Sequence, residues 1–375
     1  MRRGALEMQG SAQDWLRRLH ALPPRGRFRI MNVCGGHERS ISHSGLRAAL
    51  PEYIELIPGP GCPVCICPEE DIYTAMQMAL RHPILLVCFG DLLRVPVNTS
   101  KPEPRSLEQA RTAGADIRAI ASPLEAHAIA RRHPDKTVVF FAAGFETTMA
   151  PVAAMIAENL PANLLLLISG RLTWPAVAML LAAGGAAFDA LVAPGHVATI
   201  MGSEQWRFVA ERHGLPTAVA GFSAESLLAA FYATLQQAAE HTARLDNCYP
   251  ELVNIHGNLT AQRLLRQVFD VSDSHWRGIG VIPRSGFSLN EQYRHLDAEQ
   301  HFPIDEQARR RAGEMPPGCD CAAVVLGRIY PDACRLYGKA CTPQQPVGPC
   351  MVSDEGACRI WWRGGVRATQ ARGRT

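Results

Sequence analysis

The sequence TVVFFAAGFETT, residues 137–148, contains the unit that decides the fold of this chain. An apolar, strand-forming run ends in a glycine loop, and apolar residues at helical spacing follow over 152–158. The same order of strand, loop and helix recurs between about residues 29 and 222, which predicts parallel sheets covered by helices on both faces. The predicted strands are Phe28–Val33, Tyr53–Ile57, Ile84–Phe89, Ile117–Ala121, Thr137–Ala142, Leu164–Ile168, Ala190–Val192 and Ala218–Ala220, and the other helical patterns are Glu69–Arg81, Leu124–Arg132 and Trp174–Ala183.

These strands could form one large sheet or two smaller ones. A charged, proline-bearing stretch over 94–105 marks the clearest seam. We therefore predict an α/β fold with two doubly wound parallel-sheet domains, residues 29–116 and 117–234. Beyond residue 235 strands are hard to find, and glycine and proline turns precede a cysteine-rich segment. This texture predicts a third, loop-rich domain made of residues 1–28 and 235–375.

Composition excludes several classes of function. The formal net charge is +3 and the basic residues are dispersed, so nothing indicates a nucleic-acid partner. The N-terminal stretch lacks the apolar run of a secretory signal, and the longest apolar stretch, 176–188, is too short to cross a membrane. These features predict a cytoplasmic protein without membrane contact. Because the cytoplasm keeps thiols reduced, clustered cysteines there are metal ligands or redox groups more often than disulfide staples.

Six of the twelve cysteines lie in the last 57 residues, with the spacing C-x1-C-x12-C-x6-C-x8-C-x7-C. The paired C-x2-C knuckles of zinc ribbons are missing from this segment, whereas iron–sulfur clusters take four thiolates at more varied spacings. The remaining two thiols could form a redox pair beside such a cluster. A zinc site with two incidental cysteines is the alternative. The six residues are Cys319, Cys321, Cys334, Cys341, Cys350 and Cys358.

A second thiol motif, GPGCPVC over residues 59–65, follows a predicted strand and precedes a helix. A helix N-terminus lowers the pKa of a thiol, and the proline stiffens the turn, so Cys62 and Cys65 suit a dithiol–disulfide switch. Half of a zinc knuckle or two buried thiols are the alternatives. Cys67 and Cys248 carry no motif of their own, and Cys88, inside an apolar strand, is predicted to belong to the core.

The third motif is Cys34-Gly-Gly-His37-Glu38, a glycine turn at a strand end. A thiolate beside an imidazole suits a transition metal such as Fe(II), and it also suits a cysteine nucleophile with a histidine base. A turn that only caps the next helix is equally compatible. Glu146 has a similar ambiguity, since it could cap a helix or face a cleft opposite Cys34. Ligands of open parallel sheets bind beyond the carboxyl ends of the strands, where the loops carrying Cys34, Cys62, Glu146 and His196 would meet.

These segments together resemble the HypD family of hydrogenase maturation proteins, and the resemblance covers nearly the whole chain. It implies two α/β domains and a third domain that holds a [4Fe-4S] cluster. The matching stretches are NVCGGHE (32–38), IPGPGCPVC (57–65), FGD (89–91), RVP (94–96), FFAAGFETT (140–148), PGHV (194–197), WRGIG (276–280), CTP (341–343) and PVGPCMVSDEGAC (346–358).

The resemblance also implies a function, the assembly of the Fe(CN)2CO moiety of [NiFe]-hydrogenases. Members of the family work with a small HypC-type chaperone, which contributes its own cysteine to the iron, and receive cyanide from a HypE-type partner that carries it as a thiocyanate. The hydrogenase large subunit is then an indirect partner. The expected role is that of a metallocentre assembly scaffold with redox capacity, binding iron transiently with its CN and CO ligands.

Position by position, the resemblance implies roles for individual thiols. Cys34 is the expected iron-binding thiolate with His37 beside it, and Cys62 and Cys65 are the expected thiol–disulfide pair of the same cleft. The cluster arrangement is similar to that of ferredoxin:thioredoxin reductase, which implies Cys319, Cys334, Cys341 and Cys358 as ligands and Cys321 with Cys350 as the neighbouring redox pair.

Two residues depart from the family pattern. Cys67 stands where the family has threonine, and Ser223 stands where it has an acidic residue. Neither change touches the thiols assigned above. The alternative functions from other classes are a cluster-dependent thiol–disulfide oxidoreductase with no iron substrate and a zinc-stabilised binding module.

Overall fold

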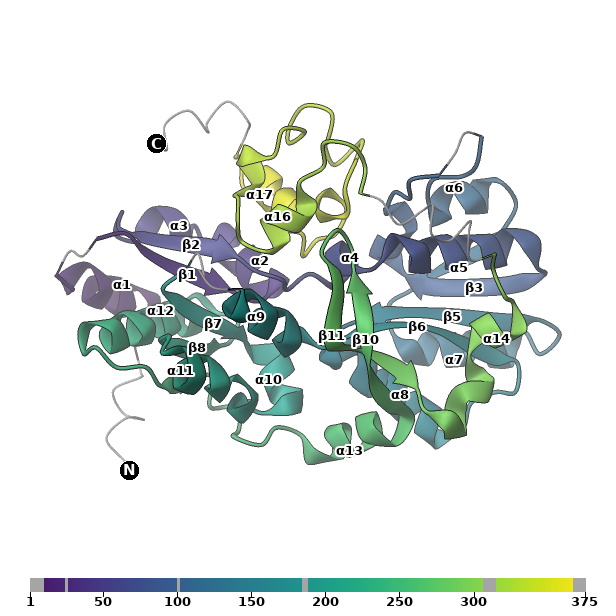
Figure 1. Ribbon diagram of the computed structural model, residues 1–375, viewed down its shortest axis with the longest axis horizontal. Helices are drawn as coiled ribbons and strands as arrows, with labels where there is room; N and C mark the ends of the chain where they lie inside the picture. The colour runs from purple at the N-terminus through teal and green to yellow at the C-terminus, as the bar shows by residue number, and fades with distance from the viewer. Residues whose placement is uncertain (1–9, 24–25, 100–101, 184–187, 306–314, 367–375) are drawn as a thin grey trace.

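The computed structural model describes residues 10–23, 26–99, 102–183, 188–305 and 315–366. Two β-sheets lie side by side, each with helices packed against it, and a lobe of short C-terminal helices sits over their junction (Figure 1). The predicted α/β class with two parallel-dominated sheets and a cysteine-rich C-terminal region is thereby confirmed.

The first sheet has five strands, all parallel, in the order β2-β1-β7-β8-β9. Its strands are β1 (Phe28–Asn32), β2 (Ile54–Pro58), β7 (Ala190–Pro194), β8 (Thr217–Ala220) and β9 (Leu245–Cys248). Its helices include α1 (Ala12–Ala21), α2 (Gly35–His43), α3 (Leu46–Ala49), α10 (Gly195–Met201), α11 (Arg207–His213) and α12 (Ala224–Ala239).

The second sheet has six strands in the order β10-β11-β6-β5-β3-β4. The four strands from β3 to β6 are parallel, and an antiparallel hairpin, β10 with β11, extends the sheet beyond β6. The strands are β3 (Ile84–Phe89), β4 (Asp116–Ile120), β5 (Thr137–Gly144), β6 (Leu164–Arg171), β10 (Phe269–Trp276) and β11 (Gly280–Leu289). Helices of this half are α5 (Glu69–Arg81), α6 (Leu107–Thr112), α7 (Pro123–Arg132), α8 (Glu146–Glu158), α9 (Thr173–Ala182) and α13 (Leu259–Val268).

The strand β5 shows why the sheets form. Phe140 and Phe141 point to opposite faces, yet both are fully buried, each in a different hydrophobic cluster. A central parallel strand covered by helices on both sides has this continuous apolar character. Burying one such side chain stabilises the fold by about 1.5–3 kcal/mol. In the described part of the chain, no helix is both long and apolar enough to cross a membrane.

The observed strand pairing does not follow the predicted boundary between two α/β domains at residues 116 and 117. β3 pairs with β4 on one side and with β5 on the other, so that boundary falls inside one sheet. β1 and β2 instead share a sheet with β7, which the chain reaches only after building β3 to β6. Apolar periodicity reports burial along a strand, whereas the choice of neighbour depends on packing between distant segments.

The expected third domain is also smaller than residues 1–28 and 235–375. Helix α1 packs on α12 of the first sheet, with the Trp15 and Tyr232 rings 5.5 Å apart. The β10–β11 hairpin belongs to the second sheet. Its two strands were not predicted because one face of the hairpin is polar and exposed, which interrupts the apolar pattern of a strand. Among the residues that the structure describes, 315–366 form the separate C-terminal lobe, which contains α16 (Cys321–Val325) and α17 (Ala357–Arg363).

Candidate functional site

The loops after β1, β2, β7 and β8 meet at the carboxyl edge of the first sheet, as expected for parallel neighbours. The β1 loop carries Cys34, which is the N-cap residue of α2. The β2 loop carries Cys62, the N-cap residue of the short helix α4 (Pro63–Ile66). His196 and Phe222 follow β7 and β8. The topology therefore brings the Cys34 motif and the Cys62–Cys65 motif to the same edge of the sheet.

Glycines let the Cys34 and Cys62 loops touch through their backbones. The Gly35 amide donates a hydrogen bond to the Gly61 carbonyl oxygen over 3.1 Å. A Cβ atom on Gly61 would lie 2.4 Å from the Cα atom of Cys34, which no side chain tolerates. The GPGC sequence is thus required for close approach, in addition to turn formation.

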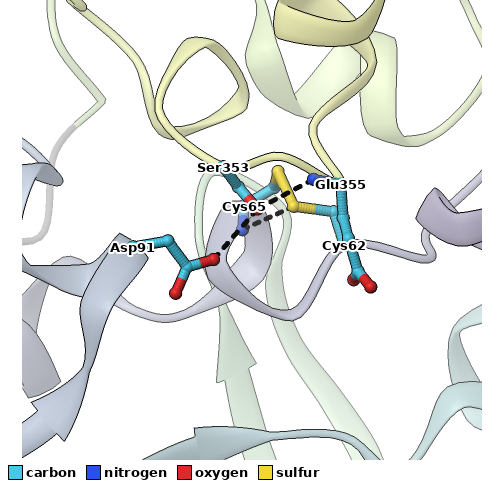
Figure 2. The surroundings of a disulfide bond; sticks show 5 residues. All are labelled: Cys62, Cys65, Asp91, Ser353 and Glu355. Atoms are coloured by element: carbon cyan, nitrogen blue, oxygen red, sulfur yellow. Dashed lines mark hydrogen bonds between the residues drawn. A yellow bond between two sulfur atoms is a disulfide. The ribbon is translucent and has the colours of Figure 1, made fainter. Parts of the chain in front are cut away.

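Cys62 and Cys65 are joined by a disulfide, and the Cys65 amide donates to the Cys62 sulfur over 3.2 Å (Figure 2). Both residues are buried, at 5% and 2% exposure. The motif therefore holds its two sulfurs within one turn of α4, with Cys62 nearer to the Cys34 loop.

A small cavity of about 10 Å³, room for a single water molecule, connects the thiol motifs. Its lining includes Cys34, Cys62 and Cys350, together with Asn32 and Glu355. Cys350 is the one member of the C-terminal six among the residues that line it. An isolated thiol, a disulfide and a C-terminal thiol, which lie up to 316 residues apart in the sequence (34 to 350), thus surround one space.

Cys34 is only half-buried, whereas most other free thiols of the described chain are buried. Its surroundings raise the pKa of the Cys34 thiol to about 12, first through burial and then through the charge of Glu355. The amides of Gly36 and His37 at the start of α2 oppose this rise. The resting group is therefore a neutral thiol, and a metal ion that binds it must displace the proton.

His37, three residues after Cys34 in the sequence, is fully buried. Its Nε2 lies 3.0 Å from the Ala220 carbonyl oxygen, to which it donates as the neutral ring, while Nδ1 has no partner among the described residues. Burial lowers the pKa of His37 to about 4. Phe222 packs between His37 and His196, with ring centroids 4.9 and 3.8 Å away. His37 is thus a neutral, fixed ring.

Glu38 of the same motif anchors α2. Its buried carboxylate forms an ion pair with Arg47 and accepts hydrogen bonds from Asn32 and from the indole nitrogen of Trp361. Trp361 lies on α17, so the bond ties the Cys34 helix to the C-terminal lobe. Glu38 therefore has a structural role, which differs from the predicted helix cap: α2 already begins at Gly35, and Glu38 makes no side-chain cap there.

Two carboxylates that the sequence did not single out lie beside the disulfide. Ser353 donates to Asp91 over 3.2 Å, and the Glu355 amide donates to the Ser353 hydroxyl over 3.2 Å (Figure 2). The pKa of Glu355 is raised to about 7, first by burial and then by the charge of Asp91. Glu355 is nevertheless exposed at the surface, and it also lines the small cavity shared with Cys34. The motif matches at 89–91 and 346–358 were the available signals for both residues.

The six C-terminal thiols gather in the lobe. Cys321 is close enough to Cys319, Cys350 and Cys358 to shift the pKa of each of these thiols. Contacts from Cys321 and Cys358 lower the pKa of Cys350, and the pKa of Cys358 is raised correspondingly. The proposed redox partners Cys321 and Cys350 are therefore neighbours.

The remaining two thiols, Cys334 and Cys341, have backbone partners. The Val347 amide donates to the Cys341 sulfur over 3.4 Å. Burial raises the pKa of the Cys334 thiol, and backbone N–H groups near its sulfur offset part of that rise. Buried sulfurs that accept backbone N–H groups suit thiolates on an iron–sulfur cluster. Within the described residues no group of three or more His, Cys, Asp or Glu side chains is arranged for a single metal ion.

Glu146 lies elsewhere. It is fully buried at the start of α8, and its carboxylate accepts hydrogen bonds from the amide and the hydroxyl of Thr173 over 2.8 and 2.7 Å. It therefore caps the first turn of α9 and is absent from the lining of the cavity shared by Cys34 and Cys62. The sequence-based alternatives were a cap on the helix that follows Glu146 or a carboxylate facing the cleft opposite Cys34, and the structure shows instead a contact with the start of the later helix α9.

Glu146 leads to a prediction about pH. Burial raises the pKa of its carboxyl from 4.5 to about 7 and outweighs the Thr173 hydrogen bonds. The folded state then holds this proton more tightly than the unfolded state, so stability is lost as the pH rises from about 4.5 to about 7. The whole window amounts to about 3 kcal/mol of unfolding free energy. We expect Glu146→Gln to remove this loss in urea denaturation at pH 5 and pH 8. Glu158→Gln, on the exposed end of α8, should keep the wild-type difference, and an unchanged difference in Glu146→Gln would contradict the assignment.

The three remaining cysteines are buried and do not line the cavity. Cys88 is fully buried in β3, as predicted for a core residue. Cys248 is buried at the end of β9. Cys67 is buried with its sulfur 3.4 Å from the Ser169 hydroxyl, and it stays outside the Cys62–Cys65 disulfide.

Fold and site together define a class of protein: a two-sheet α/β chain that collects an isolated thiol, a disulfide and six further thiols at one junction. Comparison with known proteins identifies one family for nearly the whole chain. The HypD model, described as "Hydrogenase formation hypA family", matches residues 11–365. The chain belongs to this family of hydrogenase maturation factors.

Individual relatives agree. The chain is 40% identical over 343 residues to the hydrogenase maturation factor HypD of Escherichia coli K12, covering 90% of this chain and 89% of the relative. It is 39% identical over 346 residues to HypD of Rhodobacter capsulatus, covering 91% and 90%. Against HypD of Azotobacter vinelandii the identity is 37% over 348 residues, covering 90% of each chain. The resemblance inferred from the motifs is confirmed.

Proposed function

We propose that this maturation factor is the scaffold on which the Fe(CN)2CO moiety of [NiFe]-hydrogenases is assembled. One observation carries the proposal: the half-exposed thiol of Cys34 shares a cavity with Cys62 of the disulfide and with Cys350 of the C-terminal lobe. A site that only binds a partner has no need for thiols from three segments around one space.

Cys34 is the seat of the iron in this proposal. It combines partial exposure with a fixed position at the start of α2, and no disulfide partner competes for its sulfur. A HypC-type chaperone would approach from the exposed side and add its own cysteine to the iron. Soft thiolate ligands suit such an Fe(II) ion.

Cys62 and Cys65 supply electrons for cyanide transfer. A thiocyanate on a HypE-type partner, R–SCN, takes up two electrons and one proton to give R–SH and CN⁻. Two thiols supply the electrons and become the disulfide, and the second of their two protons is released. Glu355 and Asp91, which lie beside the disulfide, are placed to exchange those protons. The cyanide is thus released next to Cys34.

The disulfide must then be reduced again, and the C-terminal lobe is placed for this step. Cys319, Cys334, Cys341 and Cys358 would hold a [4Fe-4S] cluster, which supplies electrons one at a time when bound. Cys321 and Cys350 would collect two electrons as a dithiol. Cys350 neighbours Cys321 and lines the cavity, and is thus the thiol of the lobe that shares a space with Cys62.

The competing function, a thiol–disulfide oxidoreductase that acts on other proteins, leaves the glycine-bordered thiol of Cys34 without a purpose. The burial of Cys62 and Cys65, at 5% and 2% exposure, does not separate the two functions, because both require a partner protein to reach this pair.

Anaerobic co-purification with a HypC-type chaperone, followed by infrared spectroscopy, tests the scaffold function. We expect cyanide and carbonyl bands in the complex and a brown protein with about four iron and four sulfide per chain in addition to the bound iron. A colourless protein with stoichiometric zinc would contradict the cluster. A brown complex without cyanide bands, isolated from cells that also make the HypE-type partner, would contradict the scaffold role.

A further inference from the structure

Trp361 joins the C-terminal lobe to the helix that begins after Cys34. Its indole N–H donates to Oε1 of Glu38 over 2.7 Å, across 323 positions of the sequence. Both side chains are buried, at 3% and 2% exposure. Glu38 lies one turn after Cys34 on α2, and Trp361 lies one turn after Cys358 on α17. The bond therefore links two helices close to proposed metal ligands, and the function described above makes no use of it.

The carboxylate of Glu38 keeps its charge compensated without Trp361. Arg47 donates to both carboxylate oxygens, over 2.5 and 2.7 Å, and Asn32 donates to Oε2 over 3.1 Å. A buried carboxylate is costly when it loses its cationic partner, and here that partner is the arginine. The indole bond reaches the lobe, and its removal leaves no unpaired charge.

Two ring contacts also hold Trp361. The guanidinium of Arg47 lies over its ring at 5.0 Å, and the Tyr330 ring stacks on it with centroids 5.4 Å apart. Apolar and stacking contacts favour burial of the ring without a preferred direction, whereas a hydrogen bond has a narrow range of distances and angles. The bond to Glu38 is therefore the contact that sets the position of α17 along α2.

The position of α17 matters because the lobe contributes to the cavity beside the disulfide. Ala357, the first residue of α17, lines this cavity together with Cys62 and Cys350. Cys350 belongs to the short helix η5 (Pro349–Met351), which packs against α17. A shift of α17 along α2 would therefore move Cys350 relative to Cys62.

The relay between lobe and disulfide depends on this geometry. The Cys350 thiolate attacks Cys62, and Cys65 leaves as a thiolate. Cys321 then attacks Cys350 and releases Cys62. The lobe dithiol gives up two electrons and two protons and becomes a disulfide, while the Cys62–Cys65 disulfide takes them up and becomes a dithiol. Each exchange requires two sulfurs to meet, and a misplacement of about 1 Å strongly slows a reaction that depends on position.

We infer that Trp361 is a positioning residue of the thiol relay: its hydrogen bond to Glu38 holds Cys350 within reach of the disulfide. The inference rests on the proposed function for the purpose of the relay. The geometry itself can be measured without cyanide, a partner protein or electron flow through a cluster.

Disulfide trapping in the full-length protein provides the test. Cys34→Ala, Cys65→Ala and Cys321→Ala are combined, so that Cys62 and Cys350 are the thiols that remain among the cavity-lining residues. Diamide takes two electrons and two protons from a thiol pair, and mass spectrometry of the digested protein reports the Cys62–Cys350 disulfide. We expect this cross-link to be the main product, and to form about tenfold more slowly when Trp361→Phe is added.

Matched substitutions separate the hydrogen bond from the bulk of the ring. Trp361→Phe keeps an aromatic ring beside Tyr330 and loses the N–H donor. Trp361→His, neutral at pH 8, keeps an N–H donor and loses the six-membered ring, so its rate should stay within about threefold of the starting protein. Trp362→Phe makes the same change at the next residue of α17, whose ring contacts Tyr337 within the lobe, and should leave the rate unchanged.

Circular dichroism shows whether each variant is folded. If Trp361→Phe fails to fold, Glu38→Gln tests the same bond from its acceptor and should also slow the cross-link, because an amide oxygen accepts more weakly than a carboxylate. An unchanged rate in Trp361→Phe, or an equal loss in Trp361→His, would overturn the inference. So would the absence of the Cys62–Cys350 product before Trp361 is changed. Missing cyanide bands in a protein that still forms the cross-link would refute the proposed function alone.

Discussion

Replacement of Cys34 by alanine is expected to abolish the cyanide and carbonyl infrared bands of the complex with a HypC-type chaperone. The visible spectrum of the C-terminal cluster should remain. Among the residues lining the cavity, Cys34 is the half-exposed thiol, and neither Cys62, in its disulfide, nor buried Cys350 can replace it for an incoming ion. The substitution removes one sulfur atom and leaves the contact between Gly35 and Gly61, so the fold should persist.

Cys248→Ala is the matched control for this variant. It removes a buried thiol from the same sheet, at the end of β9, outside the lining of the cavity. The control complex should keep its infrared bands and its bound iron. Persistent Fe–CN bands in Cys34→Ala would refute the role given to Cys34. Loss of the cluster spectrum in the same variant would show a structural effect instead.

Much of the fold could be predicted from the sequence because burial leaves a local imprint. The run over 137–144 is apolar without alternation, and only a strand covered on both faces has that pattern. Strand order leaves no such imprint. The return of the chain from β6 to β7 beside β1 depends on contacts between residues more than 150 positions apart, such as Ile30 with Ala190. The β10–β11 hairpin escaped prediction because Asp270, Ser272 and Ser274 make its strands read as loop.

The candidate site divides in the same way. The sequence placed Cys34 and Cys62 in loops at strand ends that would meet, and the structure brings those two loops into contact at Gly61. Glu146 carried an ambiguous signal, since a carboxylate after a strand can cap a helix as readily as it can face a ligand. Trp361 carried no motif signal, because a hydrogen bond between side chains 323 positions apart follows from tertiary packing.

The second large effect is expected in the C-terminal lobe, where Cys334→Ala should lose the cluster and Cys321→Ala should retain it. Cys334 is a proposed ligand with backbone N–H groups directed at its sulfur, which favour the thiolate that a metal requires. Cys321 instead neighbours Cys350, the thiol that lines the cavity, and lowers its pKa. Its removal should interrupt the relay to the disulfide without removing a ligand.

Iron and sulfide content, with visible and EPR spectra of anaerobically purified variants, distinguish these outcomes. We expect about four iron per chain in Cys321→Ala and less than one in Cys334→Ala. Cys350→Ala is the paired control, because it should match Cys321→Ala in iron content and likewise slow the reduction of the Cys62–Cys65 disulfide by dithionite. Equal loss of iron in Cys321→Ala and Cys334→Ala would refute the division into four ligands and one redox pair. A cluster that survives in Cys321→Ala with an unimpaired rate of disulfide reduction would keep the ligands but exclude Cys321 from the relay.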